Sequence, residues 1–94
     1  MNIQENLNLE TIVSNIYKRY RECIGQGKVA DYIPTLSTVN PDQFAISVAT
    51  VDGFQYNIGD YTTGFSIQSI SKVFTLAMLS SLMGDDIWKY VGRE

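Results

Sequence analysis

The first quarter of the chain carries apolar residues at the spacing of one helical face. The positions that define this face are Leu9, Ile12, Val13, Ile16, Tyr17, Tyr20, Cys23 and Ile24. This period predicts an α-helix over residues 9–24, with Cys23 as a small buried member of the apolar face. Asn8 belongs to the residue types that cap a helix start, and Gly25 and Gly27 favour a stop.

Two alternating segments follow an irregular stretch. Residues 28–43 contain two prolines and no sustained period, which predicts an ordered loop without helix or strand. Residues 44–51 and 54–58 alternate with the period of two that is typical of strands, and Asp52-Gly53 separates them. An Asp-Gly pair favours a two-residue type I′ turn, so we predict a β-hairpin. Because a hairpin alone is marginally stable in water, these strands need further partners.

A second helix is predicted to begin near Ser69. Its apolar residues cover more than one face: Ile70, Val73, Phe74, Leu76, Ala77, Met78, Leu79, Leu82 and Met83. A helix that is apolar nearly all round is expected to be buried, and this requires a larger folded body than 94 residues can build. Gly84 favours its end, and Asp85 can cap a following helix. That third, short helix is indicated by Ile87, Trp88 and Val91.

Length and composition allow one modest domain. The 94 residues are 45% apolar and 18% charged, as in ordinary soluble proteins. Helix, hairpin and helix in this order indicate the α+β class. The formal net charge is −3 and no basic cluster is present, which argues against nucleic acid or an anionic membrane as a partner.

The N-terminal sequence and the residue types bear on compartment and cofactors. Residues 1–6 lack the basic flank and apolar run of a signal peptide, and no segment approaches the roughly 18 apolar residues of a membrane span. We therefore expect a cytoplasmic protein. With Cys23 as the single cysteine and no histidine, neither an internal disulfide nor the common metal sites can form. We expect no metal and no cofactor.

Ser69 and Lys72 form the only Ser-x-x-Lys pattern in the chain. The bare pattern is weak, because it arises by chance in roughly a third of chains of this length. Here it lies where an extended segment turns into a helix, which is the context found in penicillin-binding proteins and serine β-lactamases. Residues three apart share a helix face, so the Lys72 amine can reach the Ser69 hydroxyl and activate it as a nucleophile.

The start of a helix also supplies a donor for catalysis. The first amides of a helix have no acceptor inside it, so the Ser69 N–H can form one half of an oxyanion hole. The second donor is not identified by the sequence. Lys72 must lose a proton before it can accept one, which costs an unperturbed lysine about 4.6 kcal/mol at pH 7. Burial beside an apolar helix would lower this cost.

The irregular loop contributes Tyr32 as a further candidate. Loops of this length in compact domains are more often part of a site than idle. If the loop reaches Ser69, the Tyr32 hydroxyl is suited to pass protons or to fix the lysine amine. The alternative, which the residues by themselves favour, is a tyrosine packed with its hydroxyl at the surface.

Two segments together resemble the glutaminase family. They are residues 27–36 (GKVADYIPTL) and 65–74 (FSIQSISKVF), and the hairpin and the run 57–60 (NIGD) between them are also similar. The likeness spans about Leu9 to the end of the chain and is far more specific than Ser-x-x-Lys alone. It implies the N-terminal part of a β-lactamase/transpeptidase-like fold, with a helix, a β-hairpin and then a buried helix starting at the Ser-x-x-Lys.

The resemblance also implies a role for four residues. Ser69 matches the family's nucleophile and Lys72 the lysine that activates it. Tyr32 matches a tyrosine that contacts substrate and assists proton transfer, and Gln68 matches a glutamine close to the bound substrate. The implied catalytic set is thus Ser69, Lys72 and Tyr32, and the implied substrate-binding set is Ser69, Tyr32 and Gln68. The implied reaction is hydrolysis of L-glutamine to L-glutamate and ammonia through a serine acyl-enzyme.

The chain departs from the family in length. Glutaminases run to roughly three hundred residues in one catalytic domain. We therefore expect residues 1–94 to be a single incomplete domain, the N-terminal portion of a glutaminase catalytic domain, inactive by itself. The expected partners are L-glutamine and, for the full-length protein, further copies in a homo-oligomer.

Two alternative functions remain open. A β-lactamase or transpeptidase would use the same Ser69 and Lys72, although the missing export signal and the segment around Tyr32 argue against it. A non-catalytic interaction domain of the same fold would need neither side chain, so its function would survive Lys72→Ala.

Overall fold

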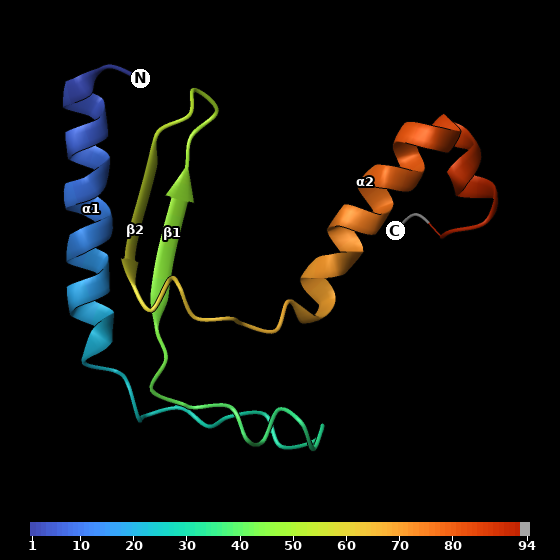
Figure 1. The fold of residues 1–94 in the computed structure, drawn as a ribbon. Helices are drawn as coiled ribbons and strands as arrows, with labels where there is room; N and C mark the ends of the chain where they lie inside the picture. The colour runs from blue at the N-terminus through green and yellow to red at the C-terminus, as the bar shows by residue number, and fades with distance from the viewer. Residues whose placement is uncertain (93–94) are drawn as a thin grey trace. The chain divides into compact units, whose positions relative to one another are not determined.

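The computed structural model describes residues 1–92, which form two compact units. One unit is Met1–Gly64 and the other begins at Phe65. In chain order the elements are α1 (Ile3–Arg21), β1 (Ala45–Ala49), β2 (Gln55–Gly59), the 3-10 turn η1 (Gln68–Ile70), α2 (Ser71–Met83) and the 3-10 helix η2 (Gly84–Lys89) (Figure 1). Two α-helices and one antiparallel pair of strands confirm the α+β class.

Helix α1 starts before the predicted position. The Asn2 side-chain oxygen accepts a hydrogen bond from the Glu5 N–H at 2.8 Å, and the Asn2 side-chain nitrogen Nδ2 donates to the Glu5 carboxylate at 3.3 Å. This reciprocal cap sets the start, so the prediction that Asn8 caps the helix is wrong. Asn8 lies inside α1, where it accepts a hydrogen bond from Gln4 at 3.0 Å. The predicted end at Ile24, before Gly25, is wrong by three residues, because α1 ends at Arg21; Gly25 lies beyond it with a φ of +92°.

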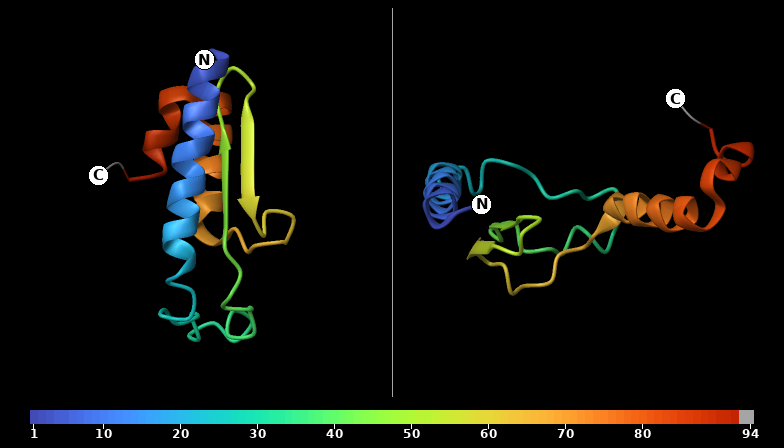
Figure 2. Two further views of the ribbon diagram at one scale, coloured as in Figure 1. Left: turned by 90° about the vertical axis from the view of Figure 1, so that its left-hand side faces the viewer. Right: turned by 90° about the horizontal axis from the view of Figure 1, so that it is seen from above.

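The two strands pair as the alternation predicts. Ile46 lies opposite Ile58 and Val48 opposite Tyr56, and these four half-buried side chains alternate with exposed ones. Helix α1 packs beside both strands (Figures 1 and 2) and buries Val13, which is 6% exposed. Cross-strand apolar pairs covered by one helix therefore form the small core of the first unit.

The hairpin is confirmed, but its turn differs from the predicted type. The Thr50 N–H donates to the Phe54 carbonyl at 2.9 Å, and the Gly53 N–H donates to the Thr50 carbonyl at 3.1 Å. A three-residue loop, Val51–Gly53, thus joins the strands, with Gly53 at a φ of +95° and Asp52 at a negative φ. A type I′ turn needs positive φ at both central residues, so that prediction is wrong. Only the glycine takes the left-handed conformation here.

The open end of the hairpin is held by contacts around Phe44. The Tyr17 and Phe44 rings stack with their centroids 4.9 Å apart and their planes 6° apart. The Asp60 N–H donates to the Phe44 carbonyl, and the Asp60 carboxylate accepts from the Phe44 N–H, both at 3.0 Å. Gly59 has a φ of +84°, and a Cβ there would lie 2.3 Å from the Phe44 carbonyl oxygen. The site requires glycine for its conformation and for its lack of a side chain.

The segment between α1 and β1 has the irregular structure that its sequence predicts. Residues 28–43 form consecutive turns, one of them closed by the Leu36 N–H donating to the Ile33 carbonyl at 2.9 Å. Cys23 is exposed, so its predicted burial is wrong. The reason is that α1 ends at Arg21, which leaves Cys23 in the following turn rather than on the helix face.

Helix α2 is exposed within residues 1–92, and its burial in a larger body stays a prediction. It begins at Ser71, after η1, and none of its residues is buried; Val73 is 67% and Phe74 63% exposed. An apolar helix needs cover on every side, whereas within its unit α2 contacts only η1 and η2 among the elements described. The sequence correctly indicated an all-apolar helix, but residues 1–92 do not bury it.

The third helix is a 3-10 helix, η2. Gly84 ends α2 as predicted, with a φ of +57°. Asp85 lies inside the first turn of η2 and does not cap it, since the cap position is Met83 and carries no side-chain hydrogen bond. The prediction that Asp85 caps this helix is therefore wrong. Ile87, 2% exposed, is the buried residue by which η2 packs against α2.

Candidate active site

Ser69 lies in the 3-10 turn that leads into α2. The residue before it, Gln68, has a φ of +49°, the one positive φ of a non-glycine residue within residues 1–92. Such a conformation is uncommon for residues with a side chain, costs about 1–3 kcal/mol and persists only where the surrounding structure holds it. The chain is thus bent sharply at the residue that precedes the candidate nucleophile.

Two hydrogen bonds from Ser71 hold this bend. The Ser71 hydroxyl donates to the Gln68 carbonyl oxygen at 2.9 Å, and the Ser71 N–H donates to the same carbonyl. The Gln68 side-chain amide donates in turn to the Ser66 hydroxyl. The bend is therefore fixed by groups within six residues of chain, 66–71, before α2 begins.

The Ser69 N–H is available at the start of these helical turns. Within residues 1–92 it has no backbone acceptor, whereas the next amide, that of Ile70, donates to the Ile67 carbonyl at 3.1 Å. An unpaired amide at the first turn can donate to a negative oxygen, which is the chemistry an oxyanion hole requires. This arrangement agrees with the donor expected from the sequence.

Lys72 stands in the first turn of α2, three residues after Ser69. Its side chain is exposed, and in the described part of the chain it makes no ion pair and no hydrogen bond with the Ser69 hydroxyl. The expected burial of Lys72 is absent here because α2 itself is uncovered. Direct contact between the lysine amine and the serine hydroxyl stays a prediction.

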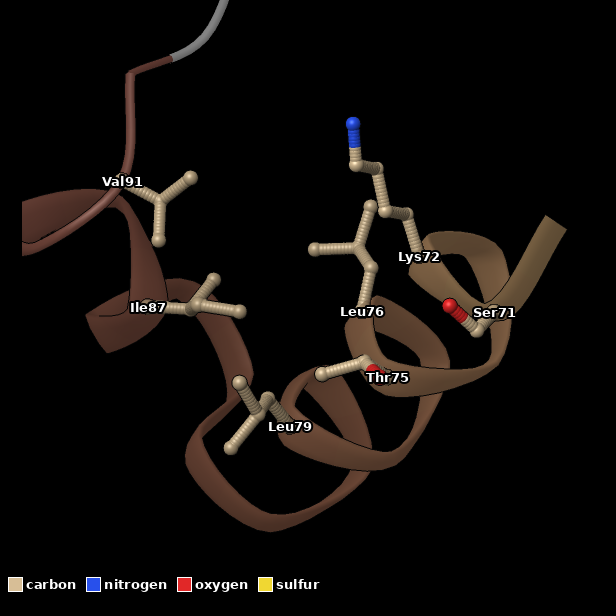
Figure 3. A pocket seen from close by; sticks show the side chains of 7 residues that line it. All are labelled: Ser71, Lys72, Thr75, Leu76, Leu79, Ile87 and Val91. Atoms are coloured by element: carbon tan, nitrogen blue, oxygen red, sulfur yellow. The ribbon is translucent and has the colours of Figure 1, made fainter. Parts of the chain in front are cut away.

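A hollow of about 240 Å³ opens beside Lys72. Figure 3 shows Ser71 and Lys72 on the first turn of α2, with Ile87 and Val91 across the hollow. The remaining lining residues are Thr75, Leu76 and Leu79. The walls are mainly apolar, so an amine at their rim borders a surface that solvates charge poorly. Ser69 is not among the lining residues.

Tyr32 lies in the loop of the first unit and is 79% exposed. Its neighbour Asp31 pairs with Lys28 at 3.0 Å between two exposed side chains. Ser69, Lys72 and Gln68 belong to the other unit. The structure thus places three of the four predicted residues together at the start of α2, and the role of Tyr32 stays a prediction.

The described residues offer no metal centre and no membrane-crossing helix. Within residues 1–92, no group of three or more His, Cys, Asp or Glu side chains is placed to hold a metal ion. Over the same residues, no helix combines the length and the hydropathy that a membrane crossing requires. Asp85 and Asp86 lie side by side in η2, where Asp86 pairs with Lys89 at 3.3 Å.

The sequence did not single out Ser71 as part of this region. It adjoins Lys72 and had no assigned role, yet its hydroxyl bonds the carbonyl of the strained Gln68. A serine three residues after the bonded carbonyl, at a helix start, was a possible signal. What sequence could not supply is the left-handed conformation of Gln68, because glutamine has no preference for it.

A bent chain with a free amide and a Ser-x-x-Lys at a helix start is typical of serine nucleophiles that attack carbonyl groups. Comparison with known proteins identifies the family of the chain. Residues 27–94 match the family model described as Glutaminase. The match covers most of the 94 residues, and the chain belongs to the glutaminase family.

Curated relatives agree with this assignment. The chain is 50% identical to a glutaminase of Rhizobium johnstonii over 86 residues, which are 92% of this chain and 28% of that protein. It is 49% identical to a glutaminase of Agrobacterium fabrum and 50% identical to one of Pseudoalteromonas atlantica, with the same coverage. The chain therefore spans about 28% of the length of the relatives it matches.

Proposed function

We propose that this chain supplies the nucleophile of a glutaminase, which hydrolyses L-glutamine to L-glutamate and ammonia. The observation that carries the proposal is the unpaired Ser69 N–H at the helix start, three residues before Lys72, in a chain of the glutaminase family. The names of the matched relatives support glutamine as the substrate.

The reaction begins with attack of the Ser69 hydroxyl oxygen on the side-chain carboxamide carbon of glutamine. Lys72 takes the hydroxyl proton, and the Ser69 N–H donates to the carbonyl oxygen as it becomes negative. Collapse of the tetrahedral intermediate breaks the C–N bond, and the nitrogen takes the proton from Lys72 and leaves as ammonia. Water then attacks the γ-glutamyl ester, and glutamate leaves with Ser69 restored to its hydroxyl form.

Tyr32 and Gln68 have supporting roles in this reaction. Tyr32, whose side chain is exposed, contacts the substrate and passes protons in both halves of the reaction. Gln68 lies directly before the nucleophile, where its carboxamide can bind the substrate's polar groups. Neither role needs a metal or an organic cofactor.

Residues 1–94 form part of a larger catalytic domain with a β-lactamase/transpeptidase-like fold. Two observations support this: α2 exposes apolar side chains all round, and the chain spans 28% of the length of its relatives. Cover over α2 would also desolvate Lys72 and favour its neutral form, which the reaction needs. The whole enzyme acts in the cytoplasm as a homo-oligomer, and residues 1–94 alone are inactive.

Two assays test this function. The purified 94-residue chain, incubated with glutamine, is expected to release no ammonia above a buffer control. A hybrid in which the 86 matched residues replace their counterparts in the Rhizobium johnstonii glutaminase is expected to release it. In that hybrid, Ser69→Ala should lower kcat by at least about 10³-fold, and Lys72→Ala by about 10²–10⁴-fold.

Matched controls give each outcome a meaning. Ser81→Ala removes the same hydroxyl from an exposed position of α2 and should leave kcat unchanged. An active hybrid that tolerates Ser69→Ala would refute the nucleophile. Serine-dependent ammonia release by the 94-residue chain itself would refute the incomplete domain. A covalent adduct with a labelled penicillin at Ser69 would instead favour the β-lactamase or transpeptidase alternative.

A further inference from the structure

The Ser71 hydroxyl makes a contact that the proposed reaction does not use. It donates to the Gln68 carbonyl oxygen at 2.9 Å, and the Ser71 N–H donates to the same atom. Ser71 is the first residue of α2, so a hydrogen bond from its backbone N–H to a carbonyl of the preceding turn is expected whatever its side chain. The hydrogen bond from the hydroxyl is additional. Its acceptor is the carbonyl of Gln68, which is the one non-glycine residue with a positive φ within residues 1–92.

The geometry of the peptide unit gives this contact a consequence. The Gln68 carbonyl and the Ser69 N–H belong to the same planar peptide, and no peptide bond in residues 1–92 is cis. In a trans peptide the C=O and N–H point in opposite directions. Holding the Gln68 oxygen toward the first turn of α2 therefore turns the Ser69 N–H away from it. The amide is left unpaired and directed outward from the helix start.

The strained residue Gln68 stands directly before this peptide, with a φ of +49° that is disfavoured for a residue with a side chain. The Gln68–Ser69 peptide turns through the ψ of Gln68 and the φ of Ser69, and such a rotation would redirect the Ser69 N–H. Two donors on the Gln68 oxygen oppose the rotation, because turning the peptide breaks both bonds at once.

We infer that Ser71 is a positioning residue, whose hydroxyl orients the Ser69 N–H as an oxyanion donor by fixing the Gln68 carbonyl. This inference rests on the proposed function, in which that amide stabilises the negative oxygen. Ser71 itself touches neither the substrate nor the reacting atoms. Its effect belongs to the transition state, where the oxyanion forms, and not to binding of neutral glutamine.

Threonine and valine at position 71 provide a matched pair for the test. The two side chains have the same shape, and threonine keeps a hydroxyl that can bond a carbonyl three residues back in a helical turn. In the active hybrid, Ser71→Val is expected to lower kcat and kcat/KM together by about 10–100-fold, with KM within about 2-fold of the parent. Ser71→Thr should stay within about 3-fold of the parent in kcat.

The hydrogen bond is also measurable in the 94-residue chain without any activity. The ¹³C chemical shift of the Gln68 carbonyl and the amide shift of Ser69 should both move in Ser71→Val and return in Ser71→Thr. Ser81→Ala, at an exposed position of α2, is the control and should move neither.

The outcomes separate this inference from the function on which it rests. If Ser69→Ala abolishes activity while Ser71→Val keeps the parent kcat, the positioning role is wrong and the nucleophile stands. Equal losses in Ser71→Thr and Ser71→Val would also overturn it, because the hydroxyl would then be irrelevant. Activity that survives Ser69→Ala refutes the proposed function itself. Unchanged Gln68 carbonyl shifts in Ser71→Val would show that the hydrogen bond is absent.

Discussion

The two units of the chain differ in how far they bury the apolar side chains of their helices. In Met1–Gly64, helix α1 lies on a hairpin, and the unit buries Val13 and stacks Tyr17 on Phe44. In the unit that begins at Phe65, helix α2 has no buried residue and leaves large side chains such as Phe74 exposed. An apolar helix therefore forms a hydrophobic core only where other elements pack against it.

The difference lies in how each helix is matched by its neighbours. Helix α1 is apolar along one stripe, and a two-stranded sheet with one apolar face suffices to cover part of it. Helix α2 is apolar around its circumference, and the short η2 covers one side of it through Ile87. The candidate residues Ser69 and Lys72 lie at the start of this less covered helix.

The largest expected effect concerns Gly59, at the open end of the hairpin in the first unit. Gly59→Ala places a Cβ against the Phe44 carbonyl, with 2.3 Å between them, at a φ of +84°. We expect a loss of roughly 2–4 kcal/mol in the free energy of unfolding of the hairpin and α1. Amide hydrogen exchange of the two strands, followed by NMR, measures it.

Gly53→Ala is the control for the conformation alone. Gly53 also has a positive φ, +95°, but open space surrounds its missing Cβ. The loss should be near 1 kcal/mol. Equal losses at the two glycines would show that the close approach of Phe44 to Gly59 has no energetic role.

The next effect compares one aromatic residue from each helix. Tyr17→Ala removes the stacked ring on Phe44, and we expect a loss of about 2 kcal/mol in the free energy of unfolding. Phe74→Ala removes a side chain that is 63% exposed and should change the stability of the 94-residue chain by less than about 0.5 kcal/mol. Urea titrations monitored by hydrogen exchange at each helix provide both values.

Phe74→Ala should have a larger effect in the active hybrid. There, Phe74→Ala is expected to cost about 3 kcal/mol, because the added chain would bury α2. If Phe74→Ala is as mild in the hybrid as in the 94-residue chain, the proposal that α2 is covered in the whole domain fails.

The smallest effect is the pH dependence of the hairpin loop. The Met1 ammonium and then the Thr50 hydroxyl donate hydrogen bonds to Asp52 and lower the pKa of its carboxyl from 3.8 to about 2. The same bond to Asp52 raises the pKa of the Met1 ammonium above its ordinary 8.0. The Asp52 contribution to stability is present above about pH 4 and is lost as the pH falls toward 2. The ammonium contribution is present below pH 8 and is lost as the pH rises through the raised value.

Asp52→Asn should therefore destabilise the first unit most between about pH 4 and 8, as urea midpoints at pH 2, 6 and 10 would show. The pair is exposed, so the difference should shrink in 1 M salt. Asp42→Asn removes the same charge elsewhere in the unit and is the control. A difference between parent and Asp52→Asn that is constant with pH would contradict the ion pair.

Local patterns predicted the elements better than their ends. The spacing of three and four residues predicted α1, and the spacing of two predicted both strands. Each type of element places apolar side chains on one face at its own spacing, so the spacing can be read from the sequence. The helix start was wrong because Asn2 and Asn8 are both good caps, and only the reciprocal bonds with Glu5 select Asn2. The predicted turn type was wrong because Asp-Gly fits both a two-residue and a three-residue loop, and the register of the strands selects the three-residue loop.

Local sequence was also enough to indicate the candidate nucleophile. Ser69 and Lys72 stand out by spacing and context, and the segment around Tyr32 adds the likeness to glutaminases that the family match confirms. The bend at Gln68 and its bond from Ser71 were not predictable, because they depend on backbone angles that those residue types do not prefer.

Residue types and their spacing were enough to predict the α+β elements, the family and the position of the Ser-x-x-Lys, because each of these is a pattern along the chain. Which apolar side chains are covered, and where the Ser69 amide points, became known only from the packing of the folded chain. Burial depends on what a helix meets in space, and the direction of an amide depends on the rotation of its peptide. Neither quantity is local to the residues that carry it, which is why the apolar pattern of α2 predicts burial but not the segment that covers the helix.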